Sequence, residues 1–190
     1  YLYYPGGSEF IRIVRESPVQ MVSGDLDGDG YDELLCSFEG KGTYLGLFSS
    51  RDAGGDRKGL KDNPEFLVAD GIRVSHKMLS LIGLYYMRIS KELPLDGLGT
   101  GFGDIAPGPG KEVLMSYSNA TYYYTLDKKR WVKITDMPFN LIITGRFTQG
   151  RYDDIIGQDV SGKGIFLFKS SEGKWENIAP SARASAMHAF

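Results

Sequence analysis

One short pattern occurs three times in the chain and limits the folds that it can adopt. A glycine, a loop of about eight residues, an acidic residue and an aliphatic pair follow one another in "GDLDGDGYDELL", "GDIAPGPGKEVL" and "GRFTQGRYDDII". The leading glycines are Gly24, Gly103 and Gly145, so the intervals are 79 residues (24 to 103) and 42 residues (103 to 145). Because the first interval is about twice the second, we expect a degenerate copy between them, within residues 66–90.

An aromatic segment follows each loop in phase. Residues 1–14 resemble the same hairpin without a preceding loop. Aromatic residues favour strands and glycine, of which the chain has 25, favours turns. A period of about 42 residues with several short strands per unit is typical of β-propeller blades, since one four-stranded sheet cannot bury both of its faces alone. The three segments are "GTYLGLF" (42–48), "ATYYYTLDKKRWVKI" (120–134) and "KGIFLFKSSEGKWENI" (163–178).

We therefore predict an all-β fold, a β-propeller with about four blades in this chain. We expect it to be part of a larger propeller, so residues 1–190 form a single propeller domain or a propeller fragment. Residues 77–92 would also fit a helix, but their β-branched and aromatic content and the phase of the repeat favour strands. The expected units are residues 1–16 (partial), 20–65, 66–96, 97–137 and 138–178.

Composition argues against several classes of protein. The chain has 22 Lys and Arg against 24 Asp and Glu, so no basic excess indicates nucleic acid or an anionic membrane. No stretch approaches the roughly 18 apolar residues that a membrane span needs. Cys36 is the single cysteine, so no disulfide forms within the chain, and its apolar surroundings predict a buried core residue.

Catalytic residues cannot be assigned from the sequence. His76 and His188 are the only histidines, and neither lies in a metal-binding or nucleophile motif. No acid/base pair can be picked out either, so we expect no catalytic residues and favour a protein that is not an enzyme. The acidic residues Asp52, Asp56 and Asp62 are irregularly spaced among basic residues, which favours a solvated loop over a partner-binding insertion.

The loop after Gly24 is a candidate cation site. Calcium takes six to eight oxygen ligands, and alternate residues of a tight loop can all turn inward. Gly30 at position 6 permits the positive φ that such a loop needs, and Tyr31 at position 7 can offer its backbone carbonyl. Without a cation the carboxylates would repel one another, so a calcium site is favoured over a metal-free acidic turn. The carboxylates lie at positions 1, 3, 5 and 9: Asp25, Asp27, Asp29 and Glu33.

An EF-hand is excluded, because its bidentate Glu at position 12 is replaced here by Cys36 in a strand-like run. The loop with its flanking Gly24 and Leu34-Leu35 instead resembles the FG-GAP/VCBS repeat, which builds the β-propellers of integrin α-subunit heads and of many secreted microbial proteins and lectins. The full motif is matched once and the other two copies match weakly. The resemblance implies that Ca²⁺ is held between the first two strands of a blade by Asp25, Asp27, Asp29, the Tyr31 carbonyl and Glu33.

The resemblance also implies an extracellular or cell-surface protein. We therefore expect a non-enzymatic, calcium-stabilised module for adhesion or for binding a protein or glycan, with the remainder of a propeller from the parent chain as a further partner. The alternative is a carbohydrate-active hydrolase or lyase on a propeller scaffold. Ligand-binding residues are not assigned. Trp131 and Trp175 would suit stacking on sugar rings, but packing between blades is favoured for the aromatic residues.

The other two loops are not expected to bind metal. In the Gly103 loop, positions 3 and 5 are Ala106 and Gly108. In the Gly145 loop, position 1 is Arg146, which either pairs with Asp154 or points to solvent. Asn119 begins a formal glycosylation sequon in an expected turn.

Overall fold

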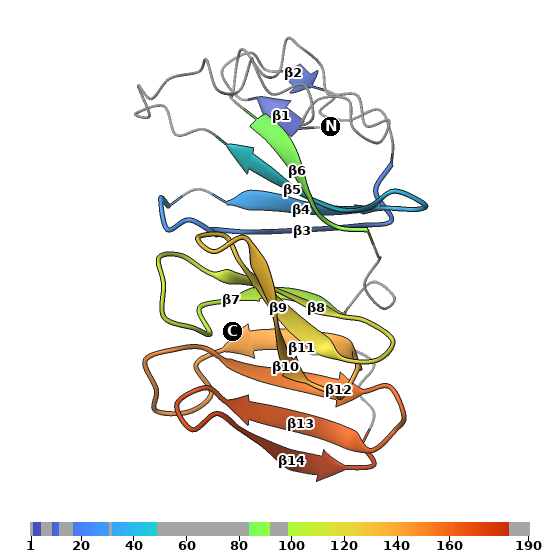
Figure 1. Cartoon of the computed structure of the whole chain (residues 1–190), viewed down its shortest axis with the longest axis vertical. Coiled ribbons are helices and arrows are strands. Elements are labelled where there is room, and N and C mark those ends of the chain that lie inside the picture. Colours follow the sequence, from blue (N-terminus) through green and yellow to red (C-terminus); the bar gives the residue numbers. More distant parts are fainter. Residues whose placement is uncertain are drawn as a thin grey trace. The chain divides into compact units, whose positions relative to one another are not determined.

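The computed structural model describes residues 2–4, 9–11, 17–30, 32–48, 84–91 and 99–182. Within these ranges the regular secondary structure consists of β-strands alone, which confirms the predicted all-β class (Figure 1). The same ranges hold no helix that is long and apolar enough to cross a membrane. The chain divides into two compact units, and each is described by itself: residues 1–21 with 33–93, and residues 22–32 with 94–190.

The strands form antiparallel sheets in which hydrogen-bonded order follows chain order. β1 (Leu2–Tyr4) and β2 (Glu9–Ile11) make the hairpin that the sequence predicts in residues 1–14. One four-stranded sheet contains β3 (Gln20–Gly24), β4 (Glu33–Phe38), β5 (Gly42–Phe48) and β6 (Leu84–Ser90). The second contains β7 (Thr100–Gly103), β8 (Glu112–Ser116), β9 (Thr121–Thr125) and β10 (Arg130–Thr135). The third contains β11 (Phe139–Gly145), β12 (Asp154–Asp159), β13 (Gly164–Lys169) and β14 (Lys174–Pro180).

The interior strands β4 and β8 show no alternation of buried and exposed residues. All five residues of β8 are buried, and so are five of the six residues of β4. Such runs indicate strands that are covered on both faces, whereas a strand with one solvated face alternates. Cys36 in β4 is 1% exposed, which confirms that it is a core residue.

The core of the second unit lies between its two four-stranded sheets. Phe139, the first residue of β11, is fully buried, and its ring centre lies 5.0 Å from that of Trp175 on β14. Gly157 makes room for this ring, since a Cβ there would lie 2.6 Å from a Phe139 ring carbon. This cluster joins the sheet that starts at β7 to the one that starts at β11. Its buried members are Ile105, Leu114, Phe139, Ile142 and Ile155.

The pairing of β6 bears on the unit boundaries expected from the sequence. β6 pairs with β5 and so completes the sheet that begins at β3, whereas the sequence placed residues 66–96 in a unit of their own. The strand predicted within residues 77–92 is present as β6 over Leu84–Ser90. Residues 49–83 lie outside the described residues, as do His76, His188 and the acidic segment at 52–62, so the unit boundaries stay a prediction.

Candidate metal centre

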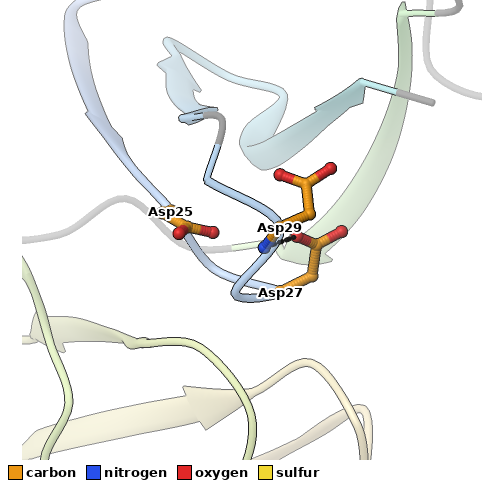
Figure 2. Close-up of side chains that lie close together, drawn as sticks. All are labelled: Asp25, Asp27 and Asp29. Carbon is orange, nitrogen blue, oxygen red and sulfur yellow. Dashed lines mark hydrogen bonds between the residues drawn. The ribbon is translucent and has the colours of Figure 1, made fainter. Parts of the chain in front are cut away.

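The acidic loop connects β3 to β4 and gathers three carboxylates. Asp25, Asp27 and Asp29 each contribute an oxygen, and these atoms all lie within 4.8 Å of one another. Figure 2 shows the three side chains grouped at the end of this turn. Asp25 is half-buried, and Asp27 and Asp29 are exposed. Three of the five predicted ligands are thus brought together within the described residues.

Backbone N–H groups hold two of these carboxylates in place. The amide of Gly28 donates to Asp25 Oδ1 (2.8 Å) and that of Gly30 to Asp25 Oδ2 (3.1 Å). The amide of Asp29 donates to Asp27 Oδ1 (3.1 Å), the dashed bond in Figure 2. Gly28 and Gly30 have φ of 80° and 88°, in the left-handed region that side chains with a Cβ disfavour. The two glycines therefore allow the chain to turn back around the carboxylates.

The loop concentrates negative charge. Although Asp27 is exposed, partial loss of hydration in the loop raises the pKa of its carboxyl. The hydrogen bond from the Asp29 amide lowers this pKa, and repulsion from Asp29 and Asp25 raises it. A divalent cation among the carboxylates would remove this repulsion. The ligands on offer are all hard oxygens, and an oxygen that accepts an N–H keeps a second lone pair. The residues present therefore fit Ca²⁺, which prefers such ligands.

The other two predicted ligands are Tyr31 and Glu33. Tyr31 lies outside the described residues. Glu33 is the first residue of β4 and belongs to the other compact unit, where it is fully buried.

An acid also starts the second strand of the sheet that begins at β7, and it ties its own loop together. Glu112, the first residue of β8, is 3% exposed. Its Oε2 accepts hydrogen bonds from the amides of Ile105 (3.0 Å) and Ala106 (3.3 Å). Burial raises the pKa of Glu112 to about 7, the two amide bonds lower it, and the charge of Asp104 raises it. A pKa near 7 would suit a general acid. This carboxyl, however, is buried and accepts hydrogen bonds from two amides of its own loop, so its role is to fix the backbone of that loop.

Asp154, the first residue of β12, plays the same part in the sheet that begins at β11. It is 1% exposed, and its Oδ2 accepts bonds from the amide (2.7 Å) and hydroxyl (2.8 Å) of Thr148. Its Oδ1 accepts the amide of Ser170 (3.0 Å). Arg146 does not take up the pairing with Asp154 that the sequence left open. Its Nε lies 3.9 Å from Asp153 Oδ1, whereas both oxygens of Asp154 accept hydrogen bonds from Thr148 and Ser170.

This backbone-holding role was missed in the sequence reasoning, which treated position 9 only as a metal ligand. The available signal was the acid at the same distance from each leading glycine: Glu33, Glu112 and Asp154. The acid at position 9 is also present in the two loops that lack carboxylates at positions 3 and 5, which indicates a role other than metal binding. In both loops it accepts a hydrogen bond from the amide of position 3, which is Ala106 in one and Thr148 in the other.

The acidic loop packs closely against the second unit's own β7–β8 connection. A Cβ on Gly110 would lie 2.1 Å from the Leu26 carbonyl oxygen, and one on Gly24 would lie 2.7 Å from the Phe102 ring. Gly110 also has φ of 74°. Only glycine lets these two backbones approach so closely, so the turn that carries the carboxylates is held from one side by residues 102–110.

The tryptophans pack against aromatic neighbours. Trp175 lies against Phe139 and also against Phe168, with 5.1 Å between ring centres in the second pair. Trp131 lies 5.2 Å from Tyr124. These contacts are made within single sheets, so packing between blades stays a prediction for Trp131, whereas Trp175 also packs against the cluster shared by two sheets. Asn119 is exposed in the β8–β9 turn, as expected for residues 117–120.

The comparisons with known proteins give no relative. No family model, no curated protein and no solved structure matches this chain.

Proposed function

We propose that the chain is a calcium-stabilised binding module of the β-propeller type, which presents a surface to a protein or glycan outside the cell. The observation that carries the proposal is the group formed by Asp25, Asp27 and Asp29, whose carboxylate oxygens lie within 4.8 Å of one another. The ion would stabilise the turn between β3 and β4. It would take no part in chemistry.

The sheet topology supports the propeller part of the proposal. Each four-stranded sheet has its strands in chain order, and the glycine-led loop joins the first two strands in all three. Two successive sheets of the second unit bury one apolar cluster between them. Stacking of such sheets is how propeller blades cover their faces.

Thermal melts with calcium and with EDTA test the metal site. An ion that binds only the folded state adds about 2.7 kcal/mol at a concentration 100 times Kd. For a chain of this length we expect the melting temperature to rise by roughly 5 to 10 °C. Asp27→Asn should abolish the response, while the control Asp127→Asn, in the exposed β9–β10 turn, should retain it. Superimposable melts with calcium and EDTA would contradict the proposal.

The binding role needs its own test. We expect saturable binding on a glycan or protein array and no turnover in a screen of glycoside and polysaccharide substrates. Turnover that persists in folded Asp27→Asn protein would contradict the binding-module proposal and favour the alternative of a hydrolase or lyase.

A further inference from the structure

The loop that joins β11 to β12 presents cations and an apolar ring to solvent. Arg146 and Phe147 follow its leading glycine, and Arg151 and Tyr152 come shortly before β12. Both arginines are exposed, and Phe147 is 40% exposed. Arginine and aromatic side chains are the residue types that bind anionic groups and flat apolar ring surfaces.

This loop is held in place from within. Asp154 accepts hydrogen bonds from the amide and the hydroxyl of Thr148 and from the amide of Ser170. Since the backbone beneath Arg146 and Arg151 is fixed before any ligand arrives, little conformational entropy is lost there on binding.

The two arginines keep donors for a ligand. Among the described residues Arg146 has one long ion pair, in which its Nε lies 3.9 Å from Asp153 Oδ1, and its side chain is 68% exposed. Arg151 lies over the ring of Tyr152, with 5.4 Å between its Cζ and the ring centre. No carboxylate in the described part of the chain forms an ion pair with Arg151. The Tyr152 ring restrains the Arg151 guanidinium, and its N–H groups remain available to an anion.

A third cation comes from the neighbouring loop. Burial of the Asp104 carboxyl and the charge of Asp153 raise its pKa, and three cations lower it: Arg146, Arg151 and Lys111. Charges act on one carboxyl through solvent only from within roughly 10 Å, so the three cations lie around Asp104. They are exposed, whereas Asp104 is half-buried and the Asp153 side chain is 19% exposed. The outward charge of this surface is therefore positive, although the chain has a net charge of −2.

A ligand of this loop must be recognised by side chains, because the main chain is occupied. The amides of Phe147, Thr148 and Asp153 all donate to acceptors within the protein. A peptide that adds a strand needs free main-chain groups, so these amides offer it no pairing. An acidic sugar instead offers a carboxylate or sulfate to the arginine fork and an apolar ring face to Phe147.

We propose that the arginine surface, formed by Arg146, Phe147, Arg151 and Lys111, binds a polysaccharide whose sugars carry carboxylate or sulfate groups. The three cations contact the anionic groups, and Phe147 packs on a sugar ring. Because anionic groups repeat along such a polymer, several cations engage one chain at once. The inference rests on the binding role proposed above, to which it assigns a ligand class and a site, and calcium takes no part in it.

Biolayer interferometry on immobilised polysaccharides tests the site. The probes are oligogalacturonate, which carries carboxylates, dextran sulfate, and neutral dextran. We expect saturable binding to one or both of the anionic probes, with calcium and with EDTA, and none to dextran. The tighter of the two anionic probes identifies the group that the arginine surface prefers. Poly-glutamate, which carries carboxylates without sugar rings, should bind more weakly than the preferred polysaccharide.

Substitutions locate the binding. Arg146→Gln and Arg151→Gln should each weaken it about tenfold and reduce its salt dependence, because each removes a charge-assisted hydrogen bond. Phe147→Ser should weaken it severalfold but keep the salt dependence, since no charge is lost. The matched control Arg130→Gln, at the exposed first residue of β10, should leave the affinity unchanged. Circular dichroism checks folding, and Arg146→Lys, which keeps the charge without the planar fork, replaces Arg146→Gln if that variant does not fold.

Three outcomes would overturn the proposal. The first is a wild-type chain that binds neither anionic polysaccharide. The second is binding that a folded variant with both Arg146→Gln and Arg151→Gln retains in full. The third is poly-glutamate that binds as tightly as the preferred polysaccharide, which would make an acidic protein the partner. Saturable binding on a glycan or protein array in the first two cases would leave the binding module standing and remove only this site.

Discussion

At the scale of single residues, an acid that looks like a metal ligand has a second role in this chain. Glu112 and Asp154 each begin the second strand of a sheet, and each accepts the amide of position 3 of its own loop. A carboxylate that accepts backbone N–H groups satisfies donors that would otherwise be buried unpaired. The same position can thus close a loop without an ion.

Glu112 gives a pH-dependent prediction. Since its pKa is raised from 4.5 to about 7, the folded state keeps a proton that the unfolded chain releases between these values. This contribution to stability is complete below about pH 4.5 and is lost as the pH rises through about 7, by roughly 3 kcal/mol at most. Glu112→Gln has no such proton to lose, so it should gain stability relative to wild type as the pH is raised.

Urea denaturation at about pH 5 and about pH 8 measures this difference. The matched control is Glu172→Gln, at an exposed position in the β13–β14 turn, which should track wild type at both pH values. A constant gap between Glu112→Gln and wild type would show that Glu112 titrates normally.

At the scale of strands and turns, the β8–β9 hairpin is fastened to the start of β11 by a buried chain of hydroxyls. The amide of Phe139 donates to Ser116 Oγ (2.7 Å), and the hydroxyls of Ser116 and Thr121 lie 3.0 Å apart. Thr121 donates to the Met137 carbonyl (2.8 Å), so Ser116 is the donor to Thr121. The β7 sheet is therefore tied to the segment that leads into the β11 sheet.

We predict that Ser116→Ala destabilises the protein by about 1 to 3 kcal/mol, because the buried amide of Phe139 loses its acceptor. The control Ser118→Ala removes an exposed hydroxyl from the adjoining turn and should change stability by less than about 0.5 kcal/mol. Chemical denaturation of both variants makes the comparison. Equal losses would mean that the Phe139 amide finds another partner.

The elements were largely predictable because they follow local rules. Alternating and aromatic runs identify the β9–β10 and β13–β14 hairpins, and the glycines identify the acidic turn. Pairings and exposures that depend on neighbouring sheets were not predictable. Leu26, Ile105 and Phe147 are equivalent in sequence, but only the last is substantially exposed. Asp153 and Asp154 are adjacent acids, but Asp153 accepts the amide of Asp104 from another sheet, and Asp154 accepts amides of its own sheet's turns.

At the scale of the whole molecule, the second unit depends on one shared cluster, with Phe139 at its centre. We predict that Phe139→Ala costs about 3 to 5 kcal/mol, since it empties a site that contacts Trp175 and Phe166. Ile178→Ala, at an exposed apolar position, should cost far less. Urea denaturation followed by tryptophan fluorescence measures both, and comparable losses would contradict a single central cluster.

Chain-order pairing of the strands has a consequence for the folding pathway. In the second and third sheets each strand joins its partner through a short connection, whereas residues 49–83 separate β5 from β6. Bringing the ends of that longer segment together costs roughly 2 kcal/mol more in loop-closure entropy than closing a tight turn. Nearby contacts form earlier than distant ones. In pulse-labelled hydrogen exchange, amides of β8, β9, β12 and β13 should therefore gain protection before those of β6, and the reverse order would rule this pathway out.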